Sequence, residues 1–373
     1  MVKPHTTVLI GPSLETEESI VTSKLPSVLP MMADSLAGMF YPPEWAPHRA
    51  TWLSWPHNQS TWPGGIASIF DGYIQFIEEI SKHEQVCINV ADPEMEQHAR
   101  QMLNQRNAGL GNVTFYQHPT NDAWCRDHGP CFMKHPDGGK IILDWEYNAW
   151  GEKYPPFDLD NAIPDSISKA LRLDRVKPGM VLEGGAVEFN GAGTVLTTRS
   201  CLLNPNRNPA LSQKDIEQFL KKYFRVNQVL WLEHGIAGDD TDGHIDTICR
   251  FVNPKTVVTV VEDDPEDYNY EPLQENLKWL NSMKLLDGGN LEVIKLPMPG
   301  PKFYQSQRLP ASYANFYICN GAVLVPTYRD PQDQLALSTL AEVFKDRVVV
   351  GIDCLEIIRG LGGLHCLCMQ EPC

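Results

Sequence analysis

The sequence lacks several features that mark membrane and nucleic-acid-binding proteins. No apolar run reaches the roughly 18 residues that a membrane-spanning helix needs. Basic residues are in deficit, with 31 lysines and arginines against 47 acidic residues, and the formal net charge is −16. Because phosphate groups attract basic surfaces, this balance disfavours a nucleic-acid partner. We therefore expect neither a membrane nor a nucleic-acid partner, and an acidic surface that attracts cations.

The ten cysteines lack the spacing of a zinc site or a disulfide framework. No C-x-x-C pair occurs, and only Cys366 and Cys368 lie close together. Scattered thiols within apolar runs are typical of reduced proteins, which predicts a cytoplasmic location. Residues 1–38 contain neither a long apolar core nor an arginine, so they do not resemble a secretory or mitochondrial signal. We interpret residues 1–38 as a poorly ordered N-terminal extension.

Regular patterns begin after residue 38 and continue to the C-terminus. Apolar residues recur at helical spacing at 69–84, 215–224 and 333–345. Four β-rich runs each contain a turn signal and predict β-hairpins. These runs are GPCFMKHPDGGKIILDW, GAVEFNGAGTVLTT, DTICRFVNPKTVVTVVE and NFYICNGAVLVPTY. The alternation of helices and strands predicts a single α/β domain over residues 39–373.

The C-terminal tail GLHCLCMQE has the pattern of one more strand, with no partner after it. Its natural partner is the early strand ATWLSW, and pairing the two would join both ends of the chain. Together with the four hairpins, this pairing makes five units that share a pattern, which favours a repeating ring. A ring would bring residues that are distant in the sequence to one central mouth.

Chemically versatile residues lie at the mouths of these units. A cysteine reacts as a thiolate, and a histidine transfers protons near neutral pH. Several carboxylates that face one pocket repel each other unless a cation lies between them. A guanidinium suits that place, because it donates paired hydrogen bonds to carboxylates and offers its central carbon to a thiolate. The candidate residues are Asp127, Glu183, His244, Asp246 and Cys366.

Local spacing refines this set. His244 and Asp246 are two residues apart in DGHID, which on a strand would put both side chains on one face. His365 is adjacent to Cys366 and on a strand would face away from it, so His244 ranks above His365 as the proton carrier. Trp124 lies close before the first candidate carboxylate and has a ring that could stack on a cation.

Each of these residues also has a structural alternative. The thiol fits a buried small residue, the imidazole a hydrogen-bonded core group and the tryptophan a core aromatic. The carboxylates fit turn caps, ion-pair partners or solvated loop acids. A metal-binding or redox module built on Cys366, His365 and Cys368 is a further alternative.

Seven motifs resemble those of the agmatine deiminase family, in the family's order and over about residues 40–373. They are FYPPEWAPHRATWLSWPHN, NDAWCRDHGP, LEGGAVEFNGAGTVLTT, CLLNPNRNP, GDDTDGHID, RLPASYANFYICNG and GGLHCLCMQEP. The resemblance implies the pentein fold of guanidino-modifying enzymes, a five-bladed α/β-propeller closed by pairing of the N- and C-terminal strands. It also implies hydrolysis of agmatine to N-carbamoylputrescine and ammonia through a covalent amidino-cysteine. This reaction belongs to putrescine (polyamine) biosynthesis and needs no metal or organic cofactor.

The resemblance implies a role for each candidate residue. Cys366 matches the family nucleophile, and His244 matches the proton-transferring histidine. Asp127 and Asp246 match the two carboxylates that hold the guanidinium. Glu183 matches the acid of the EGG motif, and its role stays open between orienting the histidine and binding a guanidinium nitrogen.

Further positions either match the family or depart from it. Trp124 matches the family's pocket tryptophan. Leu361 interrupts the glycine run that precedes Cys366, where a bulky side chain would alter the backbone of the loop. Asp240 stands where the family usually has glutamate, and a shorter acid there would retune the preferred substrate length if it holds the far amine. Cys368 stands in place of a frequent threonine, either as an incidental thiol or as an oxidation partner.

A rival within the same fold is a deiminase of free or peptidyl arginine. Such substrates carry a carboxylate or a backbone that an arginine often binds, and Arg199, Arg207 and Arg308 are available. We expect the small cationic guanidino compound agmatine as the substrate, no cofactor, and a homodimer as the default oligomer.

Overall fold

The computed structural model describes residues 35–106 and 110–373. The chain divides into two units, residues 1–37 and residues 38–373, and every element below belongs to the second. The predicted poorly ordered extension falls mainly on residues 1–34, which lie outside the described residues. Within the described ranges, none of the helices combines the length and the apolar character that crossing a bilayer requires.

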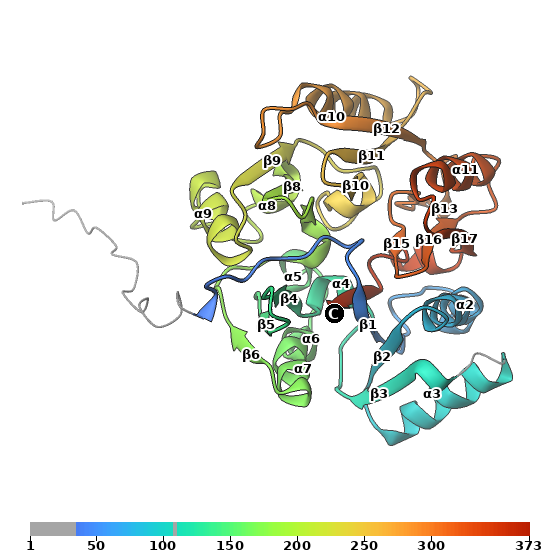
Figure 1. The fold of residues 1–373 in the computed structure, drawn as a ribbon. Helices are drawn as coiled ribbons and strands as arrows, with labels where there is room; N and C mark the ends of the chain where they lie inside the picture. Colours follow the sequence, from blue (N-terminus) through green and yellow to red (C-terminus); the bar gives the residue numbers. More distant parts are fainter. Residues whose placement is uncertain (1–34, 107–109) are drawn as a thin grey trace, which may run out of the picture. The chain divides into compact units, whose positions relative to one another are not determined.

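Five of the six sheets in the described residues repeat one pairing pattern. The strands are β1 His48–Ser54, β2 Gln85–Val90, β3 Val113–Gln117, β4 Cys131–Lys134, β5 Lys140–Leu143, β6 Asp174–Val176, β7 Glu188–Phe189, β8 Thr194–Thr198, β9 Gln228–Leu232, β10 Cys249–Asn253, β11 Thr256–Val261, β12 Glu292–Pro297, β13 Phe303–Tyr304, β14 Gln307–Arg308, β15 Tyr317–Ile318, β16 Ala322–Thr327, β17 Val348–Asp353 and β18 Cys368–Pro372. Each of the five begins with an antiparallel pair and continues with a parallel strand. The orders are β4-β5-β6, β7-β8-β9, β10-β11-β12, β15-β16-β17 and β18-β1-β2-β3, and β13-β14 is a separate small ribbon. In Figure 1 the five sheets lie around a common centre.

All four predicted hairpins are present, as the antiparallel pairs β4-β5, β7-β8, β10-β11 and β15-β16. Turn residues explain the second of them, since Gly191 and Gly193 adopt positive φ angles of 67° and 88°. The predicted pairing of the two chain ends is also present. β18 runs antiparallel to β1, from His48 opposite Pro372 to Leu53 opposite Cys368.

The helices include all three that the apolar spacing predicts, α2, α9 and α11. The α-helices are α2 Phe70–Ser81, α3 Pro93–Gln105, α4 Cys125–His128, α5 Ala149–Glu152, α6 Asp158–Asn161, α7 Ile163–Leu171, α8 Arg199–Leu202, α9 Gln213–Tyr223, α10 Tyr270–Ser282 and α11 Asp333–Val343, and the 3-10 helices are η1 Ile66–Ile69, η2 Leu110–Asn112, η3 Gly184–Ala186, η4 Ile245–Thr247 and η5 Ile357–Gly360. α9 begins with a capping box in which Ser212 and Asp215 each accept a hydrogen bond from the other's backbone N–H.

Short helical turns stand directly before the first strands of several sheets. α4 precedes β4, η3 precedes β7 and η4 precedes β10. These turns contact one another, because α4 packs against η3 and β18, and η3 packs against η4. A backbone hydrogen bond of 3.1 Å from the Arg126 N–H to the Cys366 carbonyl ties α4 to the end of the chain. Segments far apart in the sequence therefore meet at one place.

Candidate active site

The Cys366 thiol lies in a turn and borders a cavity of about 640 Å³. The strand that the sequence predicts from residue 363 begins only at Cys368, so Cys366 precedes β18 rather than lying on it. Its side chain is buried and its Sγ lies 3.7 Å from Asp246 Oδ2. The Asn315 amide donates to Sγ at 3.3 Å. A buried sulfur beside a carboxylate and at a cavity wall is consistent with a nucleophile that meets a cationic substrate.

The two predicted guanidinium-binding carboxylates are both buried and held by donors. Asp127 Oδ1 accepts the Gly185 N–H at 3.0 Å, and its Oδ2 accepts the Trp150 indole N–H at 2.9 Å. Asp246 Oδ2 lies 2.7 Å from His365 Nδ1, whereas Asp246 Oδ1 has no hydrogen-bond partner among the described residues. The two carboxylates thus have fixed orientations and retain acceptor capacity for a ligand.

Gly185 marks the space that these groups share. A side-chain carbon built on Gly185 would lie 2.6 Å from His244 Nδ1, 2.8 Å from Asp127 Oδ1 and 3.1 Å from Asp246 Oδ2. Non-bonded carbon atoms do not approach other atoms so closely, so any residue other than glycine at position 185 would overlap these side chains. The imidazole and both carboxylates therefore converge on one small volume.

His244 and Glu183 form the wall behind this space. His244 Nδ1 lies 3.7 Å from Asp127 Oδ1, and His244 Nε2 lies 4.0 Å from Glu183 Oε2. The other Glu183 oxygen accepts the Arg207 Nε–H at 2.6 Å. The prediction that His244 and Asp246 lie on a strand is wrong, because residues 245–247 form η4 and β10 begins at residue 249. The tight turn nonetheless brings both side chains to the same volume.

His365 has a different place from His244. Its Nδ1 lies 2.7 Å from Asp246 Oδ2 and its Nε2 lies 2.7 Å from Glu44 Oε2. The His365 ring therefore lies between two carboxyl groups, each within hydrogen-bond distance of one of its nitrogens. His365 therefore positions Asp246, and both of its nitrogens are occupied by carboxylates rather than available to a metal shared with Cys366 and Cys368.

Burial and charge shift the pKa values of the central groups. Burial and the neighbouring carboxylates Asp246 and Asp127 raise the pKa of the Cys366 thiol well above its ordinary value. Burial, opposed by His244, raises the pKa of Asp127 to about 6. Burial alone would lower the pKa of His244, but Asp127, Cys201 and Glu183 outweigh it and raise that pKa. These directions favour a thiol at Cys366 and a protonated imidazole at His244 in the free protein near neutral pH.

Trp124 lines the cavity and packs against the glycine-rich turn before Cys366. Its ring lies 5.5 Å from that of Trp62, and a side-chain carbon on Gly362 would come within 2.3 Å of it. Leu361, also in the cavity wall, has a φ of 69°. Leu361 thus retains the left-handed conformation that glycine adopts freely, although a bulky side chain there is expected to alter the loop.

The remaining charges of the cavity wall are mostly acidic. Asp240 lines the cavity and bonds to the Tyr154 hydroxyl, while Lys153 approaches its Oδ1 at 3.6 Å. Arg359 lines the cavity as well, but it pairs with Glu356 at 2.6 Å. The three arginines that the sequence offers for a substrate carboxylate do not line this cavity. They are Arg199, Arg207 and Arg308, paired with Glu233, Glu183 and Asp267.

Several residues of the site escape analysis of the sequence. Asn315 beside the thiol lies within the motif RLPASYANFYICNG, but nothing in its spacing marks it. Trp150 holds Asp127 and has no signal in the sequence, whereas Arg207, predicted only as a possible partner of a substrate carboxylate, instead holds Glu183. A buried polar residue between apolar neighbours is the signal that Asn315 offers, and only a partner in space makes it specific.

Comparisons with known proteins place the chain in a family. The family profile for Porphyromonas-type peptidyl-arginine deiminase matches residues 40–372. The chain belongs to this family. Among curated members of similar sequence, the agmatine deiminase of Ectopseudomonas mendocina (strain ymp) is 35% identical over 358 residues, which covers 90% of this chain and 96% of the relative. The predicted resemblance to agmatine deiminases is confirmed.

Solved structures of family relatives share this α/β fold. The agmatine deiminase of Enterococcus faecalis is 33% identical, with a TM-score of 0.84, and the match covers 90% of this chain and 96% of that one. A Porphyromonas gingivalis protein provisionally named as an arginine deiminase is 39% identical, with a TM-score of 0.82 and coverage of 90% and 98%. Relatives of similar distance therefore carry names for two different substrates.

Proposed function

We propose that this protein is an agmatine deiminase, a hydrolase that breaks a C–N bond of its substrate's guanidinium. The observation that carries the proposal is the convergence of a thiol, an imidazole and two carboxylates around the space at Gly185. A flat cation fits the adjoining cavity, which Cys366, Asp127 and Trp124 line, because it neutralises both carboxylates and presents its carbon to sulfur. The names of relatives about 35% identical support the same activity.

Charge favours agmatine over arginine as the substrate. Asp127 and Asp246 hold the guanidinium nitrogens, and Asp240 supplies a carboxylate for the amine at the other end of agmatine. Free arginine adds a carboxylate beside that amine, and peptidyl arginine replaces the amine and the carboxylate with amides. The one arginine of the described cavity wall, Arg359, is already paired with Glu356. The name of the matched family, peptidyl-arginine deiminase, supports arginine as a second candidate substrate. The acidic wall of the cavity supports agmatine.

Substrate binding activates the nucleophile. The two carboxylates that raise the pKa of Cys366 are the ones that a bound guanidinium neutralises. The thiol then loses its proton to water, and the thiolate attacks the central carbon of the guanidinium. The protonated His244 gives its proton to one amino group, the C–N bond breaks and ammonia leaves. The product of this half-reaction is an amidino group bonded to Cys366 Sγ.

Water completes the reaction. Neutral His244 takes a proton from water, and the hydroxide adds to the amidino carbon. The C–S bond then breaks with its electron pair returning to sulfur, and loss of the hydroxyl proton leaves the urea group of N-carbamoylputrescine. Glu183 orients His244, since its free oxygen faces Nε2 while Arg207 holds the other. Production of N-carbamoylputrescine suits a role in putrescine synthesis.

The architecture that suits this chemistry is a five-bladed propeller. Five sheets with one pairing pattern and the pairing of β1 with β18 support this assignment. Residues 39–373 then form the single catalytic domain, with the site residues at the inner ends of the blades. Isologous pairing of two chains into a homodimer is the default for such an enzyme.

The decisive experiment traps the covalent intermediate. Intact-mass analysis after rapid acid quench with agmatine should show one added amidino group, and peptide mapping should locate it on Cys366. Cys366→Ala should lack the adduct and the turnover. Substantial agmatine hydrolysis by Cys366→Ala would refute the mechanism. Comparison of agmatine, arginine and Nα-blocked arginine tests the substrate, with kcat/KM expected to be at least about 100-fold higher for agmatine.

A further inference from the structure

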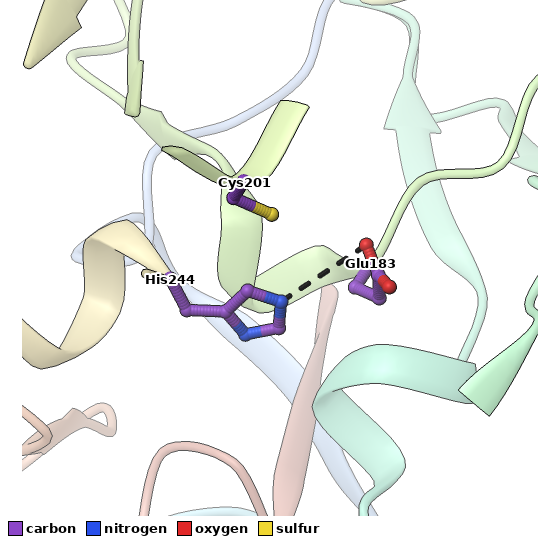
Figure 2. Close-up of side chains that lie close together, drawn as sticks. All are labelled: Glu183, Cys201 and His244. Carbon is purple, nitrogen blue, oxygen red and sulfur yellow. Dashed lines mark ion pairs between the residues drawn. The ribbon is translucent and has the colours of Figure 1, made fainter. Parts of the chain in front are cut away.

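Three potential metal ligands meet beside the candidate active site, and they are Glu183, Cys201 and His244 (Figure 2). Glu183 precedes η3, Cys201 lies in α8 and His244 precedes η4. Their ligand atoms all lie within 4.8 Å of one another, and all three side chains are buried. Figure 2 shows the carboxylate and the thiol turned toward the same edge of the imidazole. Each residue type is a common zinc ligand, and together they supply one oxygen, one sulfur and one nitrogen.

This group contains polar atoms that face charged neighbours at 3.7–4.0 Å but make no hydrogen bond to the described residues. Glu183 Oε2 and both His244 ring nitrogens are buried and have no hydrogen-bond partner among the described residues. A buried polar atom without a hydrogen-bond partner is unfavourable, because it has lost its contact with water. Arg207 occupies only Glu183 Oε1 and thereby aims Oε2 at His244 Nε2, 4.0 Å away. Once His244 Nε2 and the Cys201 thiol lose their protons, the site offers electron pairs to a metal ion, so metal binding releases protons and is favoured as the pH rises.

We propose that Glu183 Oε2, Cys201 Sγ and His244 Nε2 bind a zinc-class divalent cation. Zinc bonds to these atoms measure about 2.0–2.3 Å, so side-chain rotations that draw the ligand atoms roughly 1 Å together would complete the site. The sulfur and the imidazole select zinc or cobalt over magnesium or calcium, which prefer oxygen ligands. Three protein ligands leave a fourth position for water.

Occupation of this site blocks turnover, a consequence that rests on the proposed function. A cation on Nε2 prevents the His244 ring from carrying two protons at once. The ring can then neither protonate the departing nitrogen nor regain its proton from water. The cation is thus an inhibitor rather than a cofactor. Cys201 takes no part in the chemical steps, which makes it the residue that separates metal binding from catalysis.

Cobalt(II) is the probe for this site, because a thiolate bound to cobalt absorbs in the near ultraviolet by charge transfer. The full-length protein is stripped with a chelator, desalted and titrated with cobalt. The charge-transfer band should appear in the wild type and in Cys366→Ser, and it should be absent from Cys201→Ala. Cys249→Ala is the matched control, because Cys249 is equally buried but lies outside the group, in β10. Its band should match the wild type.

Zinc inhibition gives a second readout. Each variant's agmatine turnover is normalised to its own metal-free rate. Cys201→Ala should raise the zinc concentration for half inhibition more than about tenfold, since loss of even an indirect partner weakens metal sites by that factor. Thermal unfolding verifies that the variants fold, and Cys201→Ser replaces Cys201→Ala if the latter does not.

Two outcomes would overturn the proposal. One is a wild type without the band, and the other is a band that survives in Cys201→Ala but vanishes in Cys366→Ser, which would place cobalt on the nucleophile. The cobalt titration needs no turnover. A protein that binds cobalt through Cys201 but does not hydrolyse agmatine therefore refutes the proposed function alone, and an active enzyme without the band refutes the metal site alone.

Discussion

Among the site residues, Gly185 has little room for a side chain. A methyl group there would fall within about 3 Å of His244, Asp127 and Asp246, and would displace the side chains that are proposed to bind and protonate the substrate. Gly185→Ala should therefore lower kcat/KM for agmatine by at least about 100-fold, because displacement of reacting groups by 1 Å has that effect. Steady-state kinetics measure the loss, and thermal unfolding separates it from misfolding.

Gly111→Ala is the matched control for this change. A side-chain carbon on Gly111 would meet nothing within 4 Å, so activity should stay at the wild-type level. If Gly185→Ala folds and retains wild-type kcat/KM, the side chains beside Gly185 do not bind and protonate the substrate as proposed.

Residue types with strong chemistry are easier to predict than the groups that hold them. Asp127, His244 and Cys366 stand at the mouths of predicted hairpins, and the structure brings all three near one volume. Asn315 and Glu44 have no such signal, because their roles come from contacts between residues far apart in the chain, such as Asn315 with Cys366 across 51 positions and Glu44 with His365 across 321. Local pattern carries no information about such contacts.

At the scale of elements, hairpins were predictable and the turns before them were not. The turn residues of β7-β8 require positive φ angles, which glycine reveals in the sequence. η3 and η4 are too short for any apolar period, so alternation suggests a strand where a 3-10 turn exists. The site residues lie on these turns, and for that reason their identity was easier to predict than their local structure.

The glycine-rich turn before Cys366 gives the element-scale prediction. A methyl group on Gly362 would come within 2.3 Å of Trp124, and such overpacking typically costs about 1–3 kcal/mol. Gly362→Ala should therefore displace the turn with its nucleophile and lower kcat/KM for agmatine by about 100-fold. Kinetics and thermal unfolding, measured together, test both consequences.

Leu361→Gly is the comparison variant in the same turn. Its backbone already has the φ of 69° that glycine adopts freely, so the turn should persist and most activity with it. If Leu361→Gly lost as much activity as Gly362→Ala, the site would require the Leu361 side chain as well as the backbone conformation of the turn.

At the scale of the whole molecule, the buried carboxylate of Glu44 and its partner Arg250 together link segments of all five repeating sheets. Glu44 precedes β1 and pairs with Arg250 of β10 at 2.9 Å and with Arg126 of α4 at 3.4 Å. It also binds His365, before β18, at 2.7 Å and accepts the Ile318 N–H of β15 at 2.9 Å. Arg250 in turn pairs with Glu188 of β7 at 2.8 Å. Sequence pattern alone predicts the sheets but not this junction between them.

Loss of the Glu44 charge should therefore destabilise the whole protein. Burial alone would raise the pKa of Glu44, but Arg250, His365 and Arg126 outweigh it and hold that pKa well below its ordinary value. A depressed pKa means that the charge stabilises the fold above pH ~4.3, and that this stability is lost as the pH falls. Glu44→Gln leaves buried cations uncompensated and should cost about 3–5 kcal/mol of unfolding free energy.

Denaturant unfolding at neutral pH and at progressively lower pH measures both effects of Glu44→Gln. The wild type should lose stability steeply as the pH falls below ~4.3, and the variant should lose less, because it lacks the carboxylate that is protonated there. Glu78→Gln is the control, since its exposed ion pair with Lys82 at 3.9 Å is worth less than about 1 kcal/mol. Equal stability of Glu44→Gln and Glu78→Gln at neutral pH would mean that the sheets hold together by apolar packing alone, with the buried charges contributing only to the placement of Asp246.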